Sequence, residues 1–355
     1  MQGRRGAIWL LGAIALVAVV VVLKRVQFGW GMFWQQLGQL SWWHIVAAVA
    51  LIWGTYWLRA VRWAEFCRAT KRVRARELVG PQFVGFTAVA MFGRLADLVR
   101  PYLLARRTGL TVSSQVAVYT VERMFDLGAA AVVFSSALAF SPAGLEHRDR
   151  FVRVGAGSLA ATLALAVFAV TVRMKGEDVA AWAGGRLERL SPKLAAGVVE
   201  KILGFREGLR AVSSVREFAV ALAISLTMWV MIGGAYVETA HGFVATPELA
   251  GLSFSRTMLL MAVSLGGSLV QLPVLGWFTQ IAVMATAMHG FYRAPVEAAT
   301  ACAATILVVT TLSIVPLGLW FARVEGVSLR GVAGESGAAG KSDEPLELDS
   351  SASQR

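Results

Sequence analysis

Long apolar runs are the feature that most constrains what this chain can fold into. A helix needs about 20 mostly apolar residues to cross the hydrocarbon core of a bilayer. Six runs are of this kind, at residues 7–23, 42–58, 116–140, 152–172, 217–240 and 297–321. Hydrophobic residues make up 57% of the 355 residues and charged residues 16%, with a mean hydropathy of +0.62. This pattern excludes an ordinary globular enzyme and predicts an all-α polytopic membrane protein with about six full spans.

Two further apolar stretches are interrupted by helix-breaking residues. Residues 81–93 are too short to cross a bilayer and contain Pro81 and Gly85. Residues 254–290 are long enough to cross twice, but glycines and Pro273 interrupt their middle. Both stretches are therefore predicted to be broken or re-entrant helices.

The distribution of basic residues predicts how these elements are oriented. Lys and Arg are abundant directly after the second span and again in 173–216, and such a bias marks the cytoplasmic side of a membrane protein. The net charge of +12 is thus interpreted as a record of orientation, and no nucleic-acid partner is expected. Counting membrane crossings from these cytoplasmic segments places both termini in the cytoplasm. It also gives 81–93 and 254–290 opposite orientations. Many transporters form a midplane site from such an inverted pair.

The remaining segments complete a single predicted domain over residues 1–332. The first run ends in Leu23-Lys24-Arg25 and lacks a small-residue cleavage site, so we expect an uncleaved span. Apolar and basic residues alternate at helical spacing over 177–210, which favours interfacial amphipathic helices, with a soluble helical hairpin as the alternative. Residues 333–355 are rich in Gly, Ala, Ser and acids and are predicted to be a disordered tail.

The stretch between Gly93 and Pro101 brings charge to a chain reversal. Arg94, Asp97 and Arg100 are three residues apart and would share one face of a helical turn. A guanidinium suits phosphate because its planar fork donates two hydrogen bonds at once. This spacing points to a site for a lipid phosphate. The alternative is that the arginines are interfacial anchors that extend their charge to water.

A second group of charges lies inside the apolar run 116–140. Glu122 and Asp126 are four residues apart and share a helical face, whereas Arg123 lies about 100° away. Charges in a membrane interior tend to face a cavity or a partner. We therefore predict a charge network of Asp97, Glu122, Arg123 and Asp126 that holds Arg94, Arg100 or Arg106 in place. The alternative is a network that only fixes helix packing.

The third group lies in the second interrupted stretch and contains no charged residue. Its candidate residues are Gln271, Pro273, Gly276 and Gln280. The amide side chains and a broken backbone could hydrogen-bond a lipid head group. A kinked helix with polar packing is the alternative interpretation.

Signatures of enzymes and cofactor sites are missing from the sequence. The four His are scattered without an HExxH pattern, and no GxSxG, Walker A or DxD pattern occurs. The two Cys form no CxxC pair. We therefore expect no catalytic residue, no metal and no cofactor, and we expect that the protein is not an enzyme.

Taken together, these motifs resemble the lysylphosphatidylglycerol synthase transmembrane-region family of flippase-like membrane proteins. The residues that carry the resemblance are Gly93-Arg94, Asp97, Arg100-Pro101-Tyr102, Ala105-Arg106-Arg107, Gly109, Val121-Glu122-Arg123, Phe125-Asp126 and Leu272-Pro273 through Gln280. The resemblance extends from about residue 7 to 330 and adds Arg106 to the candidate phosphate-binding residues Arg94 and Arg100. Where many members look like Pro-Gly-Gly-x-Gly-x-x-Glu, this sequence has Pro273 followed by Gly276 and Gln280.

The resemblance implies a function in lipid movement. It implies a protein of the cell (inner) membrane that moves or binds an anionic lipid, a phospholipid or a polyprenyl-phosphate-linked sugar, between leaflets. Members are sometimes fused to a soluble domain that aminoacylates phosphatidylglycerol, and we expect no such domain in this chain. Membrane lipids and a separate cytoplasmic lipid-modifying enzyme are the expected partners. The alternatives are a membrane-embedded transferase with Asp97, Glu122 or Asp126 as general base, and a non-transporting scaffold.

Overall fold

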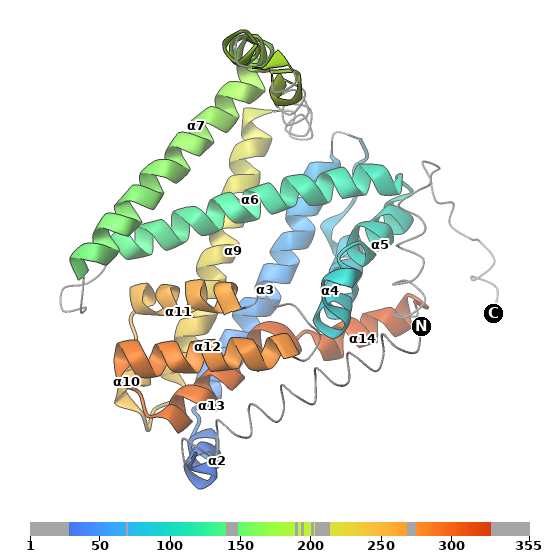
Figure 1. Cartoon of the computed structure of the whole chain (residues 1–355). Coiled ribbons are helices and arrows are strands. Elements are labelled where there is room, and N and C mark those ends of the chain that lie inside the picture. Colours follow the sequence, from blue (N-terminus) through green and yellow to red (C-terminus); the bar gives the residue numbers. More distant parts are fainter. Residues whose placement is uncertain are drawn as a thin grey trace, which may run out of the picture. The chain divides into compact units, whose positions relative to one another are not determined.

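Every regular element that the structure describes is helical, as predicted (Figure 1). The computed structural model describes residues 28–68, 70–139, 148–188, 191–192, 195–199, 202, 214–267 and 275–327. Its helices are α2 (Trp30–Gly38), α3 (Trp42–Cys67), α4 (Ala75–Phe92), η1 (Gly93–Ala96), α5 (Val99–Thr108), α6 (Val112–Ala139), α7 (Arg148–Leu187), α9 (Val215–His241), α10 (Pro247–Ala250), α11 (Phe254–Gly267), α12 (Leu275–Tyr292), α13 (Val296–Leu307), η2 (Val308–Leu312) and α14 (Val315–Val324). The predicted span 7–23 and the predicted tail 333–355 lie outside these residues.

Three helices among the described residues are long and apolar enough to cross a membrane. They are α3, α9 and the helix Val296–Val324 that α13, η2 and α14 form together. They correspond to the predicted spans 42–58, 217–240 and 297–321, so the chain is an integral membrane protein of helical type. The helix α6 covers the predicted span 116–140 as far as Ala139 but carries three charged residues in its middle. Six full spans stay a prediction.

The chain divides into two compact units, each described by itself. The first comprises residues 1–53, 89–94 and 232–315, and the second comprises 54–88, 95–231 and 316–355. In the first unit α12 packs against α11 and α13, and α2 packs against α13. The Gly29 N–H donates a hydrogen bond of 3.1 Å to Glu297 Oε1, which ties the start of α2 to the start of α13. The predicted broken element 254–290 thus corresponds to α11 and α12, with 268–274 outside the described residues.

The second unit contains residues 75–88 of α4 and the whole of α5, which pack against each other. The predicted interruption at Pro81 is wrong, because α4 continues through Pro81 to Phe92. The break comes at Gly93, whose φ of 70° is a conformation that residues with a side chain rarely adopt. The chain then returns, and α5 passes so close to α4 that a Cβ at Gly85 would lie 2.7 Å from the Arg100 Cβ. The α5 helix ends at Gly109, which has φ 67° and donates its N–H to Ala105 O.

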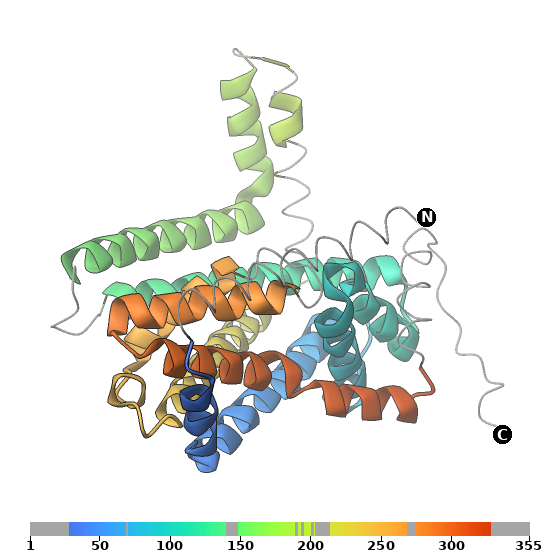
Figure 2. The same cartoon turned by 60° about the horizontal axis from the view of Figure 1, so that its bottom comes forward.

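Three more helices of the second unit are α14, α6 and α7. The α14 helix lies against α4, because Gly318 has no room for a side chain next to Thr87, and the rings of Phe83 and Phe321 stack with centroids 5.8 Å apart. The α6 helix packs against both α5 and α7. Lys175 inside α7 has non-helical angles (φ −131°, ψ 35°), and Figure 2 shows the change of direction that results.

Candidate functional site

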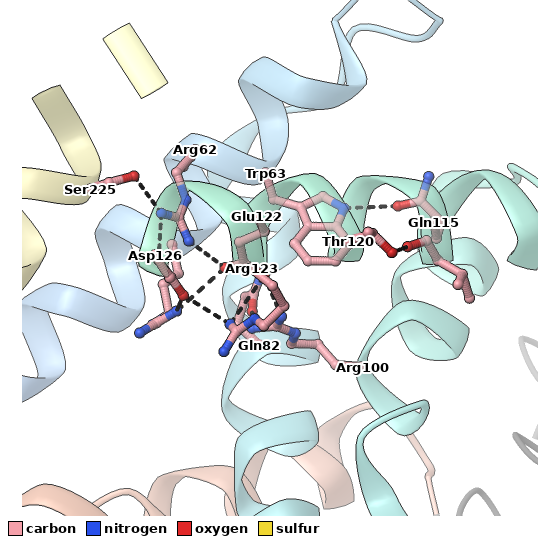
Figure 3. A network of polar contacts seen from close by, with 12 residues as sticks. Arg62, Trp63, Gln82, Arg100, Gln115, Thr120, Glu122, Arg123, Asp126 and Ser225 are labelled. Carbon is pink, nitrogen blue, oxygen red and sulfur yellow. Dashed lines mark hydrogen bonds and ion pairs between the residues drawn. The ribbon is translucent and has the colours of Figure 1, made fainter. Parts of the chain in front are cut away.

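A buried cluster of arginines and carboxylates lies in the second unit. We call it the arginine–carboxylate network and define it as Arg59, Arg62, Arg100, Glu122, Arg123 and Asp126 (Figure 3). The acids come from one face of α6, as their four-residue spacing predicts. Helix α3 contributes Arg59 and Arg62, and α5 contributes Arg100.

Arg62 bridges the two carboxylates of α6. Its Nη1 donates to Asp126 Oδ1 at 2.7 Å and its Nη2 donates to Glu122 Oε1 at 2.7 Å. The same Nη1 lies 2.6 Å from the hydroxyl oxygen of Ser225 on α9. One turn earlier on α3, Arg59 Nη1 donates to Asp126 Oδ2 at 3.0 Å and lies 3.4 Å from Glu122 Oε1. Arg62 therefore connects three helices that are far apart in the sequence.

Arg100 enters the network from α5 and is held by charge and by aromatic rings. Its Nη2 donates to Glu122 Oε2, which is the contact predicted between Glu122 and the 94–107 stretch. Its Nη1 lies 3.5 Å from Gln82 Oε1 on α4. The guanidinium carbon lies 4.6 to 5.0 Å from the ring centroids of Phe86, Tyr119 and Trp63. Rings at this distance attract a cation through their quadrupole, so Arg100 is fixed on several sides.

Arg123 is the most accessible member of the network. Its Nη2 lies 3.0 Å from Asp126 Oδ2 and 3.5 Å from Glu122 Oε2, and its side chain is 38% exposed. The side chains of Arg62 and Glu122 are at most 1% exposed. A buried ion pair that loses one partner leaves an uncompensated charge, which costs about 3 to 5 kcal/mol. The inner members are consequently fixed by one another, whereas Arg123 can reach a further partner.

The helix predicted over 42–58 extends further than expected. The sequence assigns Arg59 and Arg62 to the segment after this span, but α3 continues to Cys67 and buries both side chains. The helix can continue because Glu122 and Asp126 neutralise the two guanidiniums. Their three-residue spacing in an apolar, Trp-rich run was the available signal, since residues three apart share a helical face, as do the two acids four apart.

The network contains more positive than negative charge. Four guanidiniums face two carboxylates, a formal excess of two positive charges among the described residues. Asp97, which lies in electrostatic range of Tyr119, reduces the excess to one if it is counted. The buried nitrogens Arg62 Nε, Gln82 Nε2 and Arg123 Nε have no hydrogen-bond acceptor within the described ranges. Buried donors and charges of this kind normally have partners, so the site is suited to an anion.

The sequence matches a known membrane-protein family over most of its length. The model of the lysylphosphatidylglycerol synthase transmembrane region matches residues 9–319. The chain belongs to this family. It is also 29% identical to "Glycosyltransferase AglD" of Haloferax volcanii over 294 aligned residues, which cover 74% of this chain and 46% of that protein. The aligned region of this family member therefore covers less than half of that relative.

The other predicted site residues of this family member lie in several places. Arg94 is in η1, and its side chain is outside the described part. Asp97 is half-buried directly after η1, and Arg106 is half-buried in the last turn of α5. The structure thus brings Arg100, Glu122, Arg123 and Asp126 together and places Arg106 elsewhere in the unit.

The second group of predicted residues is only partly described. Gln271 and Pro273 lie outside the described residues, whereas Gly276 and Gln280 lie on α12 in the first unit. Gln280 Nε2 donates to the Ser264 hydroxyl of α11 at 2.6 Å, and Tyr236 of α9 lies 3.3 Å from the same oxygen. Among the described residues, no three His, Cys, Asp or Glu side chains gather in a way that could hold a metal ion.

Proposed function

We propose that this family member binds an anionic lipid at the arginine–carboxylate network and moves it between leaflets. The excess of positive charge in the network carries this proposal. Positive charge is costly in a membrane interior, and an anionic head group would lower that cost as it passes. Arg123 is the member best placed to contact the phosphate, because its side chain is 38% exposed, more than that of any other member of the network.

The proposed topology supports passage of a head group across the bilayer. We propose six full spans, cytoplasmic termini and two re-entrant elements of opposite orientation, formed by the α4–α5 hairpin and by α11 with α12. A helix rises about 1.5 Å per residue, so the 14 residues of α11 extend over about 21 Å and fall short of a hydrocarbon core of about 30 Å. Short paired helices of this kind support the re-entrant arrangement.

The charge of the network and the comparisons support an anionic lipid as the ligand. A phospholipid or a polyprenyl-phosphate-linked sugar would supply the phosphate that the guanidiniums favour. The family name points to phosphatidylglycerol derivatives and the relative's name points to glycosyl transfer. In the proposed role the protein itself is not an enzyme, and a separate cytoplasmic lipid-modifying enzyme acts before or after it.

A membrane-embedded transferase is the second candidate, because the matching relative is named a glycosyltransferase. Such an enzyme would use Asp97, Glu122 or Asp126 as general base. Glu122 and Asp126 accept hydrogen bonds from two or three guanidiniums, however, and a carboxylate held in this way is a weak base. The geometry therefore favours lipid binding over catalysis by these two acids.

Lipid movement can be measured with the purified full chain in liposomes. A fluorescent phosphatidylglycerol in the inner leaflet is protected from an added quencher until it reaches the outer leaflet. We expect protein-dependent movement of phosphatidylglycerol to exceed that of phosphatidylcholine. Arg123→Gln should reduce the movement of phosphatidylglycerol about tenfold, the effect of one lost charge-assisted hydrogen bond.

Arg72→Gln is the matched control, because Arg72 is an exposed arginine outside the network. It should leave lipid movement unchanged. Movement no faster than in protein-free liposomes would reject the transport function and leave the scaffold alternative. A lipid product of altered mass, detected by mass spectrometry after incubation with a lipid-linked donor, would support the transferase instead.

A further inference from the structure

A second group of arginines surrounds a pocket in the same unit. The pocket has a volume of about 410 Å³ and lies between α4, α5 and the end of α14. We call it the arginine pocket and define it by its charged lining residues Arg76, Glu77, Arg106, Arg107 and Glu325. It shares no residue with the arginine–carboxylate network, and the proposed function does not use it.

A carboxylate of the chain itself already lies among these arginines. Glu325 Oε1 lies so close to Gly80 that any side chain on residue 80 would collide with it. Burial raises the pKa of the Glu325 carboxyl, and the positive charges of Arg107 and Arg106 offset this only in part. The Glu325 carboxylate is thus in electrostatic range of both guanidiniums and marks a place for an anionic group beside α4.

The rest of the pocket combines a positive and an apolar wall. Three guanidiniums face the two carboxylates of Glu77 and Glu325, so the lining carries one formal positive charge in excess. Arg106 and Arg107 are consecutive on the last turn of α5, and Arg106 is half-buried. Leu103, Phe321 and Val324 provide apolar surface next to these charges. Such a lining suits a phosphate group attached to an apolar chain.

We propose that the arginine pocket is a phosphate-binding site, with Arg106 and Arg107 as the binding residues and Glu325 as an intramolecular competitor for them. The guanidiniums donate paired hydrogen bonds to the phosphate oxygens, and the apolar wall receives the chain that the phosphate carries. The ligand is a lipid head group or free phosphate, since both have the same chemistry at this point. This inference does not depend on lipid movement through the network.

Binding can be measured by calorimetric titration of the full chain in nanodiscs of neutral lipid. The two probes are hexyl phosphate and inorganic phosphate, and empty nanodiscs correct for partitioning. Arg106→Gln and Arg107→Gln should each weaken binding of the phosphate probe about tenfold, because each removes a charge-assisted hydrogen bond. Glu325→Gln should strengthen binding severalfold, because it removes the competing charge. Arg72→Gln, with the same change of charge outside the pocket, should have no effect.

The two probes distinguish the sources of the phosphate. Tighter binding of hexyl phosphate would assign the pocket to a lipid or another phosphate on an apolar chain, and equal affinities would assign it to free phosphate. The proposal is overturned if neither probe binds, if the two pocket variants bind like wild type, or if Arg72→Gln weakens binding as much as they do. The Glu325→Gln variant keeps the test decisive if an arginine variant fails to fold, since unchanged or weaker binding in Glu325→Gln would reject the competitor role.

Discussion

The arginine–carboxylate network and the arginine pocket contain the same residue types but differ in exposure. In the network, Arg62 and Glu122 are completely buried and their charged atoms lie 2.7 Å apart. In the pocket, Arg76 and Arg107 are exposed, and Glu325 acts on Arg106 and Arg107 through electrostatics at longer range. Both regions belong to the same unit and both have an excess of positive charge.

The difference teaches that the surroundings determine what an arginine contributes. A guanidinium without water must be neutralised within the fold, so its removal affects stability first. A guanidinium that keeps water is held weakly, contributes little to stability and remains available for a ligand. We therefore expect the same kind of substitution to lower stability in the network and to weaken ligand binding in the pocket.

The largest expected effect is on stability, from a substitution inside the network. Glu122→Gln leaves Arg62 and Arg100 without their common carboxylate, and it should lower the free energy of unfolding by about 3 to 5 kcal/mol. The measurement is thermal unfolding of the purified protein in detergent. Glu65→Gln is the control, because it removes a carboxylate from the partly exposed pair with Arg68, a pair worth about 0 to 1 kcal/mol. Equal effects of the two variants would contradict the distinction between buried and exposed charge.

A smaller effect is expected where α4 and α5 come together beside the network. Gly85→Ala would place a methyl group 3.0 Å from the Arg100 backbone, so the helices must separate, at a cost of about 1 to 3 kcal/mol. Gly128→Ala on α6 is the matched control, since no atom lies within 4 Å of the added carbon. Unfolding measurements that find Gly85→Ala as stable as Gly128→Ala would show that the close approach is not required.

The smallest effect on stability is expected in the pocket. Arg107→Gln removes an exposed charge at the end of α5 and should change the free energy of unfolding by no more than about 0.5 kcal/mol. The same variant should weaken phosphate binding in the titration described above. A loss of stability as large as that of Glu122→Gln would place Arg107 in the same class as the network and remove the contrast between the two regions.

Local spacing in the sequence predicts part of the site correctly. Because Glu122 and Asp126 are four residues apart, they are predicted to share a helical face. Because charge is costly in an apolar run, both are predicted to have basic partners. The contact between Glu122 and Arg100 follows from this reasoning. The helical class and the membrane location follow from the apolar runs.

Long-range pairing accounts for most of what the sequence did not predict. In the sequence, Arg59 and Arg62 look like the end of an apolar run. Their burial is possible only because acids on a helix some 60 residues away neutralise them. Proline usually interrupts a helix, but α4 continues through Pro81. The helix ends instead directly before Gly93, where the backbone adopts a positive φ. The arginine pocket requires side chains from three separate helices, so no single motif identifies it.

The bridge that Arg62 makes has a consequence for how the protein is made. The acid that neutralises Arg62 is Glu122, which is synthesised 60 residues later. At about 5 to 20 residues per second, the ribosome needs roughly 3 to 12 s to cover that distance. During this interval the two arginines of α3 are without their acids, and an unpaired arginine opposes insertion into a bilayer, by about 2.5 to 3.5 kcal/mol when it lies at the centre of a helix. The buried contact that joins α3 to α6 can therefore form only after α6 has been synthesised, so the network is completed late in the production of the chain.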